Sequence, residues 1–103
     1  MSQQVTTKTI LDFTYVSADE DGEWFDVSDC DKVIFEVDVA DACPVKLQLD
    51  TAGDEGNIIE LGSYTANAEK VMDDPVGYVR AITSGAGASD TAVVKIHMIY
   101  MKE

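Results

Sequence analysis

Apolar and polar residues alternate along most of this chain with a period of two. The pattern is unbroken in segment 91–101, where one face collects every second residue (Ala92, Val94, Ile96, Met98 and Tyr100). A period of two over this length is typical of a strand with one buried face. Segment 76–83 has the same character, and the loop 84–90 between the two segments predicts a closing hairpin.

Five more segments carry strand patterns: 5–16, 32–40, 45–50, 58–65 and 69–72. In 32–40 the predicted inward face is Val33, Phe35, Val37 and Val39. A short turn and Pro44 separate this segment from 45–50, and the two form the strongest hairpin signal in the chain. A turn cluster with two glycines, 51–57, separates 45–50 from 58–65.

Turns recur about every ten residues, and no segment has a helical hydrophobic period. These features predict an all-β fold, an antiparallel β-sandwich of jelly-roll or Ig-like type with about seven to eight strands. The length of 103 residues fits one domain. Residues 1–7 are expected to form an N-terminal arm, because the first four carry no packing signal.

The charge is strongly negative, with 20 acidic against 7 basic residues and a formal net charge of −13. Proteins that bind nucleic acids or anionic membranes need clustered basic residues, and here these are scattered singly. The sequence therefore predicts neither nucleic-acid nor membrane partners. It also shows no secretory signal and no apolar run long enough for a membrane span, so synthesis in the cytoplasm of the producing cell is expected.

Cofactor and metal sites have weak support. Cys30 and Cys43 flank one predicted strand, which would hold them about 30 Å apart, so they are expected to be unpaired apolar fillers. Seven of the thirteen residues in 19–31 are acidic, but their spacing differs from that of an EF-hand. A solvated acidic loop is favoured, and a calcium site using Asp19, Asp21 and Asp50 is the weaker alternative. No cofactor is predicted.

Catalysis is not expected either. His97 is the only histidine, it lies in mid-strand, and the chain contains no G-x-S-x-G motif. Trp24 and Phe25 follow the loop 17–23, so one should anchor that loop to the core while the other forms a surface contact. Trp24 and Tyr64 leave carbohydrate binding open as an alternative.

Four pieces of the sequence resemble small β-sandwich proteins found on tailed bacteriophage particles. These pieces are F-D-V-S with D-K-V-I-F-E-V (25–28 and 31–37), L-Q-L-D with I-I-E-L-G-S (47–50 and 58–63), G-Y-V-R-A-I (77–82) and the closing strand pair. The second piece is similar to a hairpin of these proteins, so the resemblance implies that 45–50 pairs with 58–63. The chain departs from the pattern at 58–59, where two isoleucines stand at the place of a frequent tryptophan.

The resemblance implies a virion structural protein, specifically a capsid decoration (cement) protein that binds the major capsid protein on the outside of the shell and stabilises it. A role in neck or tail attachment is the close alternative, and a carbohydrate- or cell-surface-binding module the more distant one. The negative charge suits the outer surface, away from packaged DNA. A homo-oligomer such as a trimer is implied, and the candidate partner-binding residues are Val5, Thr7, Trp24, Phe25 and Tyr64.

Overall fold

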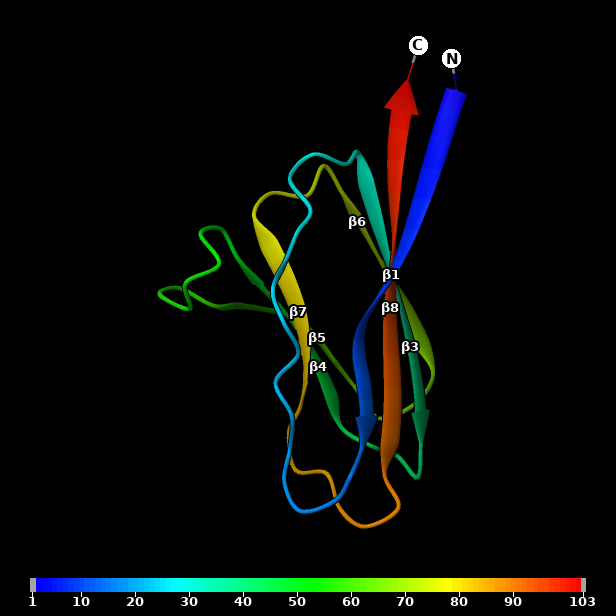
Figure 1. Cartoon of the computed structure of the whole chain (residues 1–103), viewed down its shortest axis with the longest axis vertical. Helices are drawn as coiled ribbons and strands as arrows, with labels where there is room; N and C mark the ends of the chain where they lie inside the picture. The colour runs from blue at the N-terminus through cyan, green and yellow to red at the C-terminus, as the bar shows by residue number, and fades with distance from the viewer. Residues whose placement is uncertain (1, 103) are drawn as a thin grey trace.

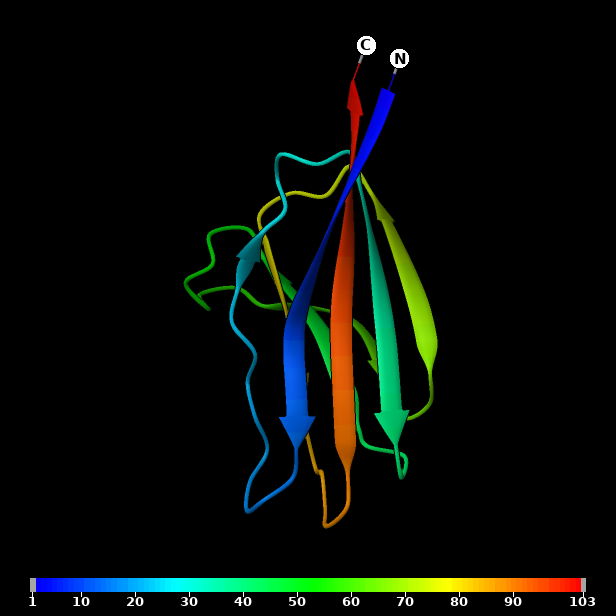
Figure 2. The same cartoon turned by 45° about the vertical axis from the view of Figure 1, so that its right-hand side comes forward.

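The computed structural model describes residues 2–102, which form two four-stranded antiparallel sheets packed face to face (Figures 1 and 2). The predicted β-sandwich is confirmed. Its eight strands are β1 (Ser2–Thr14), β2 (Phe25–Asp26), β3 (Lys32–Ala40), β4 (Val45–Asp50), β5 (Ile59–Tyr64), β6 (Ala68–Asp73), β7 (Tyr78–Thr83) and β8 (Thr91–Lys102). Within this part of the chain, no helix is long and apolar enough to cross a bilayer.

The strand order is β1-β8-β3-β6 in one sheet, called sheet A here, and β2-β7-β4-β5 in the other, called sheet B. The long strand β8 lies between β1 and β3, where Ile96 is opposite Lys8 on one side and Phe35 on the other. The final segment therefore organises sheet A, as its unbroken alternation indicates.

Two of the predicted hairpins are wrong. Strands β7 and β8 lie in different sheets, and so do β3 and β4. The chain crosses between the layers at 84–90 and at 41–44, where Asp41 and Ala42 have positive φ angles of 58° and 55°. Only the predicted pairing of β4 with β5 is confirmed. Alternation shows which side chains are buried but not which strand is the neighbour. Two successive strands have the same alternation whether they form a hairpin or lie in different sheets.

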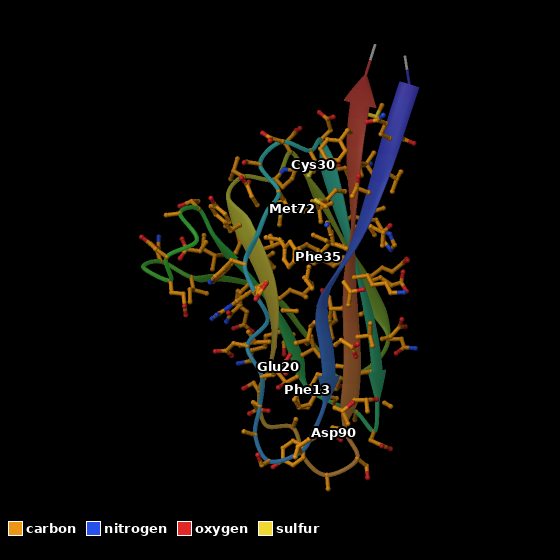
Figure 3. The ribbon with its side chains drawn as sticks, in the orientation of Figure 1. Phe13, Glu20, Cys30, Phe35, Met72 and Asp90 are labelled. Atoms are coloured by element: carbon orange, nitrogen blue, oxygen red, sulfur yellow. The ribbon has the colours of Figure 1, made fainter. Side chains whose placement is uncertain are left out.

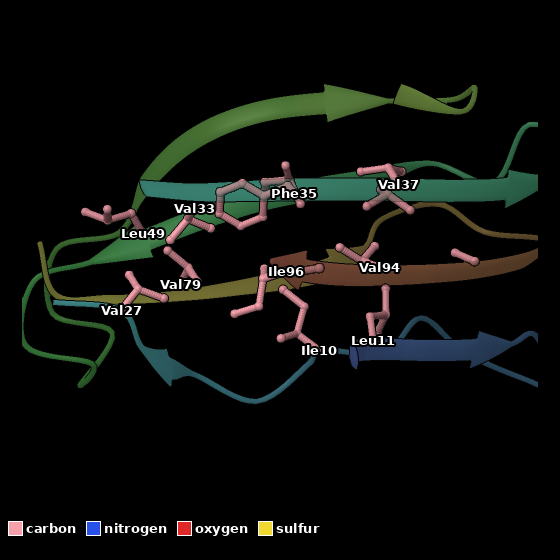
Figure 4. Close-up of a cluster of buried hydrophobic side chains, with 14 of the residues drawn as sticks. Ile10, Leu11, Val27, Val33, Phe35, Val37, Leu49, Val79, Val94 and Ile96 are labelled. Carbon is pink, nitrogen blue, oxygen red and sulfur yellow. The ribbon is translucent and has the colours of Figure 1, made fainter. Parts of the chain in front are cut away.

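The core lies between the two inner faces (Figures 3 and 4). Phe35 is fully buried at its centre, and the predicted inward residues of β3 and β8 form most of the sheet A side. The predicted faces of both strands are confirmed. The cysteines Cys30 and Cys43 are buried and unpaired, also as predicted, and the Cys30 thiol donates a hydrogen bond to the Val27 carbonyl at 3.0 Å.

The first strand starts earlier than predicted. Residues 2–7, expected as an arm, belong to β1 and pair with the end of β8, where Gln3 is opposite Met101 and Thr7 opposite His97. Met1 lies outside the described residues. A β-bulge between Thr9 and Leu11 turns Ile10 as well as Leu11 into the core. The two-residue strand β2 was not predicted, because two residues are too few to show a period.

The segment between β1 and β2 closes one side of the sandwich. The Gly22 amide donates a hydrogen bond to the Ala81 carbonyl of β7 at 2.8 Å. A Cβ atom at Gly22 would lie 2.5 Å from the Ala81 carbonyl oxygen and 2.6 Å from that of Ile10 in β1. Gly22 therefore lies between the backbones of β7 and β1, and the space there admits only a glycine.

Candidate interaction surfaces

The outer face of sheet A, which is turned away from sheet B, carries apolar side chains at one end. We call this cluster the outer patch of sheet A; it comprises Val5, Ile34, Val71, Ile99 and Met101. Val5 is 57%, Val71 52% and Met101 47% exposed, and the two isoleucines are half-buried. Exposed apolar clusters on an otherwise charged protein are typical of interaction sites.

His97 of β8 lies in the middle of this face, and its side chain contacts residues of both neighbouring strands. Its Nδ1 atom is 2.9 Å from the Thr7 hydroxyl of β1, and its Nε2 atom is 2.9 Å from Oε1 of Glu36 on β3. The hydrogen bond from His97 lowers the pKa of Glu36 below its ordinary value. Thr7, a predicted partner-binding residue, is thus part of a polar cross-strand network beside the outer patch.

The order of hydroxyl, imidazole and carboxylate in this network matches that of a nucleophilic triad. The network nevertheless lies on a sheet face, and the backbone amides of β8 and β3 around it are engaged in strand pairing. The two contacts of His97 link β1, β8 and β3 across the outer face of sheet A.

The outer face of sheet B holds a buried cation. Arg80 of β7 is 7% exposed, and its guanidinium lies 4.5 Å from the centroid of the Trp24 ring. Its Nε atom donates to Gln48 at 2.9 Å, and its Nη1 atom is 3.4 Å from the Glu55 carboxylate. Trp24 thus covers an arginine, a contact for which the sequence shows no local signal because residues 24 and 80 are far apart along the chain.

The other two predicted aromatic contacts face inward. Phe25, opposite buried Val79, packs against the core and anchors the acidic segment. Tyr64 also packs against the core, with its ring over Gly62. Trp24 and Tyr64 therefore lie on opposite faces of sheet B and at opposite ends of its strand order, so they do not form a joint aromatic platform.

The three candidate calcium ligands are not brought together. Asp19 accepts hydrogen bonds from the amides of Gly85 and Ala86, both at 2.8 Å, beyond the C-terminal end of β7. Asp50 is buried at the opposite end of sheet B and accepts bonds from the Ala52 and Gly53 amides. Among residues 2–102 no three His, Cys, Asp or Glu side chains are placed to hold a metal ion. Asp19 and Asp50 serve as anchors for loops.

A prediction follows for Asp19, whose pKa is held below its ordinary value of 3.8, first by the Gly85 amide and then by the Ala86 amide. A carboxyl with a lowered pKa in the folded state contributes stability above pH 3.8, and that contribution is lost as the pH falls through the folded-state value. We expect Asp19→Asn to lower the denaturation midpoint at pH 7, and the difference from the parent to shrink below pH 3.8.

The measurement for Asp19 is urea denaturation at a series of pH values. Asp12→Asn, which removes the same charge from an exposed strand position, serves as the control and should leave the midpoint nearly unchanged. A difference between Asp19→Asn and the parent that stays constant down to pH 2.5 would contradict the assignment.

Sequence reasoning missed the most distinctive feature of β1. All 20 acidic residues lie at position 12 or later, so the segment 1–11 contains none. Residues 3–9 of β1 are exposed on both faces, and Lys8 is their only charged residue. The uneven distribution of acids along the sequence was the available signal.

Comparison with known proteins supports the fold. No protein-family model matches the sequence, and no curated protein matches it significantly. The structure is similar to the crystal structure of SPBc2 prophage-derived protein YomS, with a TM-score of 0.67 over 94% of this chain and 95% of that chain. The sequence identity is 14%, so the likeness shows a shared β-sandwich fold and does not transfer individual residues.

Proposed function

We propose that this chain is a structural protein of a tailed bacteriophage particle, a capsid decoration protein that binds the outside of the shell and stabilises it. The observation that carries the proposal is the outer patch of sheet A, an open apolar surface suited to docking on another protein. The occurrence of the same fold in a prophage-derived protein supports a phage context.

Charge supports the outer surface of the particle as the location. A net charge of −13 is repelled by packaged DNA, which disfavours the inside of the shell. The major capsid protein is the proposed partner, and neck or tail attachment through the same patch is the alternative within the virion. A glycan-binding role has less support, because Trp24 covers Arg80 and Tyr64 faces the core.

The copy number of the chain in purified particles tests the proposal. Quantitative mass spectrometry should find on the order of hundreds of copies per particle for a shell protein, since it binds a repeated capsid subunit. About a dozen copies or fewer would indicate a neck or tail position instead. Absence from purified particles would overturn the virion role.

A matched pair of variants tests the docking face. We expect Val71→Asp to weaken binding to particles that lack the protein by about tenfold, because it places a charge inside an apolar contact. Val16→Asp introduces the same charge at a valine that is 86% exposed and lies outside both sheets, and it should bind like the parent. Equal binding of both variants in a co-sedimentation assay would exclude the outer patch as the docking face.

A further inference from the structure

The four sheet edges of this molecule differ in how they are protected against pairing with another chain. Strand β2 has two residues, β5 is short and its pairing with β4 contains a register shift, and β6 has three charged residues among six. Such devices are the usual protection of edge strands. Strand β1 is thirteen residues long, its register shift comes only after Thr9, and Lys8 is the one charged residue in 3–9.

The exposed part of β1 also leads away from the body of the molecule. Figures 1 and 2 show the start of β1 and the end of β8 running together beyond the other strands. Residues 3–9 are exposed on the side that faces sheet B as well as on the outer side. The segment 20–25 lines a groove with residues 9–12 of β1 but not with residues 3–8, so this first part of the edge is open to an added strand.

The distribution of acidic residues indicates which kind of partner could pair with the edge of β1. A basic partner would be drawn to the acidic surfaces, and the first acid of β1 is Asp12. The neutral stretch is instead the place where two copies of a chain with a net charge of −13 can meet without opposing carboxylates. Antiparallel pairing also sends the two acidic bodies in opposite directions, beyond the screening distance of about 8 Å at physiological salt.

We propose that two copies of this chain dimerise by antiparallel pairing of their β1 edges, which joins the two copies of sheet A into one eight-stranded sheet. Residues that face each other across an antiparallel pair point to the same side, so the register must match odd with odd and even with even positions. The exposed run 3–9 is centred on Thr6. With the two-fold axis there, Thr6 lies opposite its own copy, Val5 opposite Thr7, and Gln4 opposite Lys8.

This arrangement accounts for the composition of the segment. Threonine and valine favour strands, and Thr–Thr pairs stabilise neighbouring strands. The register keeps the two Lys8 side chains apart. An isologous pair uses the same edge on both subunits and therefore closes as a dimer rather than a trimer. The proposal goes beyond the virion role and does not depend on it.

The first test is the mass of the full chain in solution. Sedimentation equilibrium should give twice the chain mass. Thr6→Asp places two carboxylates opposite each other at the two-fold axis and should raise the dimer dissociation constant about tenfold. Thr14→Asp, an exposed substitution at the far end of β1, should not. A monomer at all concentrations, or a trimer, would overturn the proposal.

The second test is a disulfide across the axis. Opposite residues in an antiparallel pair have Cα atoms about 4.5–5.5 Å apart, within reach of a disulfide. Under mild oxidation Thr6→Cys should therefore form a covalent dimer. Asp12→Cys lies on the same strand but about 40 Å from its copy in this register and should not. The native thiols are buried, which raises their pKa and keeps them out of the reaction.

Equal cross-linking of the two cysteine variants would exclude this register. The outcome is separate from that of the virion tests, because it is measured on the isolated chain. A dimer that is absent from particles would leave this inference standing and remove the decoration role, and a monomer found at hundreds of copies per particle would do the reverse.

Discussion

Replacing Gly22 with alanine is expected to lower the free energy of unfolding by about 3 kcal/mol, at the upper end of the cost of overpacking a rigid site. The added Cβ atom would lie 2.5 Å from the Ala81 carbonyl oxygen and 2.6 Å from that of Ile10. A relaxed contact between carbon and oxygen is about 3.3 Å or longer. Both oxygens belong to backbone, so a side-chain rotation cannot relieve the overlap.

Relief requires the segment around Gly22 to move away from β7 or β1. The first movement stretches the 2.8 Å hydrogen bond between the Gly22 amide and Ala81, and the second displaces the bulge that buries Ile10. Urea denaturation measures the cost. Gly87→Ala is the matched control, because a Cβ atom there would meet nothing within 4 Å. Equal midpoints for the two variants would contradict the close packing at Gly22.

The sequence predicted the layers of this fold better than its connections. Alternation in β3 and β8 identified the buried faces correctly, since burial is a local property of a strand. The partner of each strand is a long-range property, and the closing hairpin was wrong for that reason. Gly22 illustrates the same limit: within an acidic segment it is typical of a turn, while its actual role depends on residues 10 and 81.

The same difference between local and long-range information applies to the candidate interaction surfaces. Val5 and Thr7 were predicted as partner-binding residues in an unstructured arm, and the structure places both on a paired strand beside His97. Pairing at the start of β1 depends on the last residues of β8, so no local pattern could predict it. Of Trp24 and Phe25, one was expected to anchor the loop and the other to form a surface contact, and the sequence did not decide between them. The contact of Trp24 with Arg80 is visible only in the folded chain.

Replacing Arg80 with methionine is expected to destabilise the fold by about 2–3 kcal/mol. A desolvated cation–π contact contributes about 2 kcal/mol and a hydrogen bond such as that to Gln48 about 1 kcal/mol. The Glu55 carboxylate is 56% exposed and 3.4 Å away, so the ion pair adds little by comparison. Methionine retains the apolar stem of the side chain, which separates the loss of charge from the loss of packing.

Two further variants identify which contact dominates. Arg80→Lys keeps the positive charge but loses the planar group that stacks on Trp24, so it should remain destabilised. Glu55→Gln removes the ion pair and should cost less than about 0.5 kcal/mol. Trp24 is the single tryptophan, so its fluorescence reports this site directly and should shift in both Arg80 variants. Full rescue by lysine, together with a large loss in Glu55→Gln, would show instead that the ion pair holds the outer face of sheet B together.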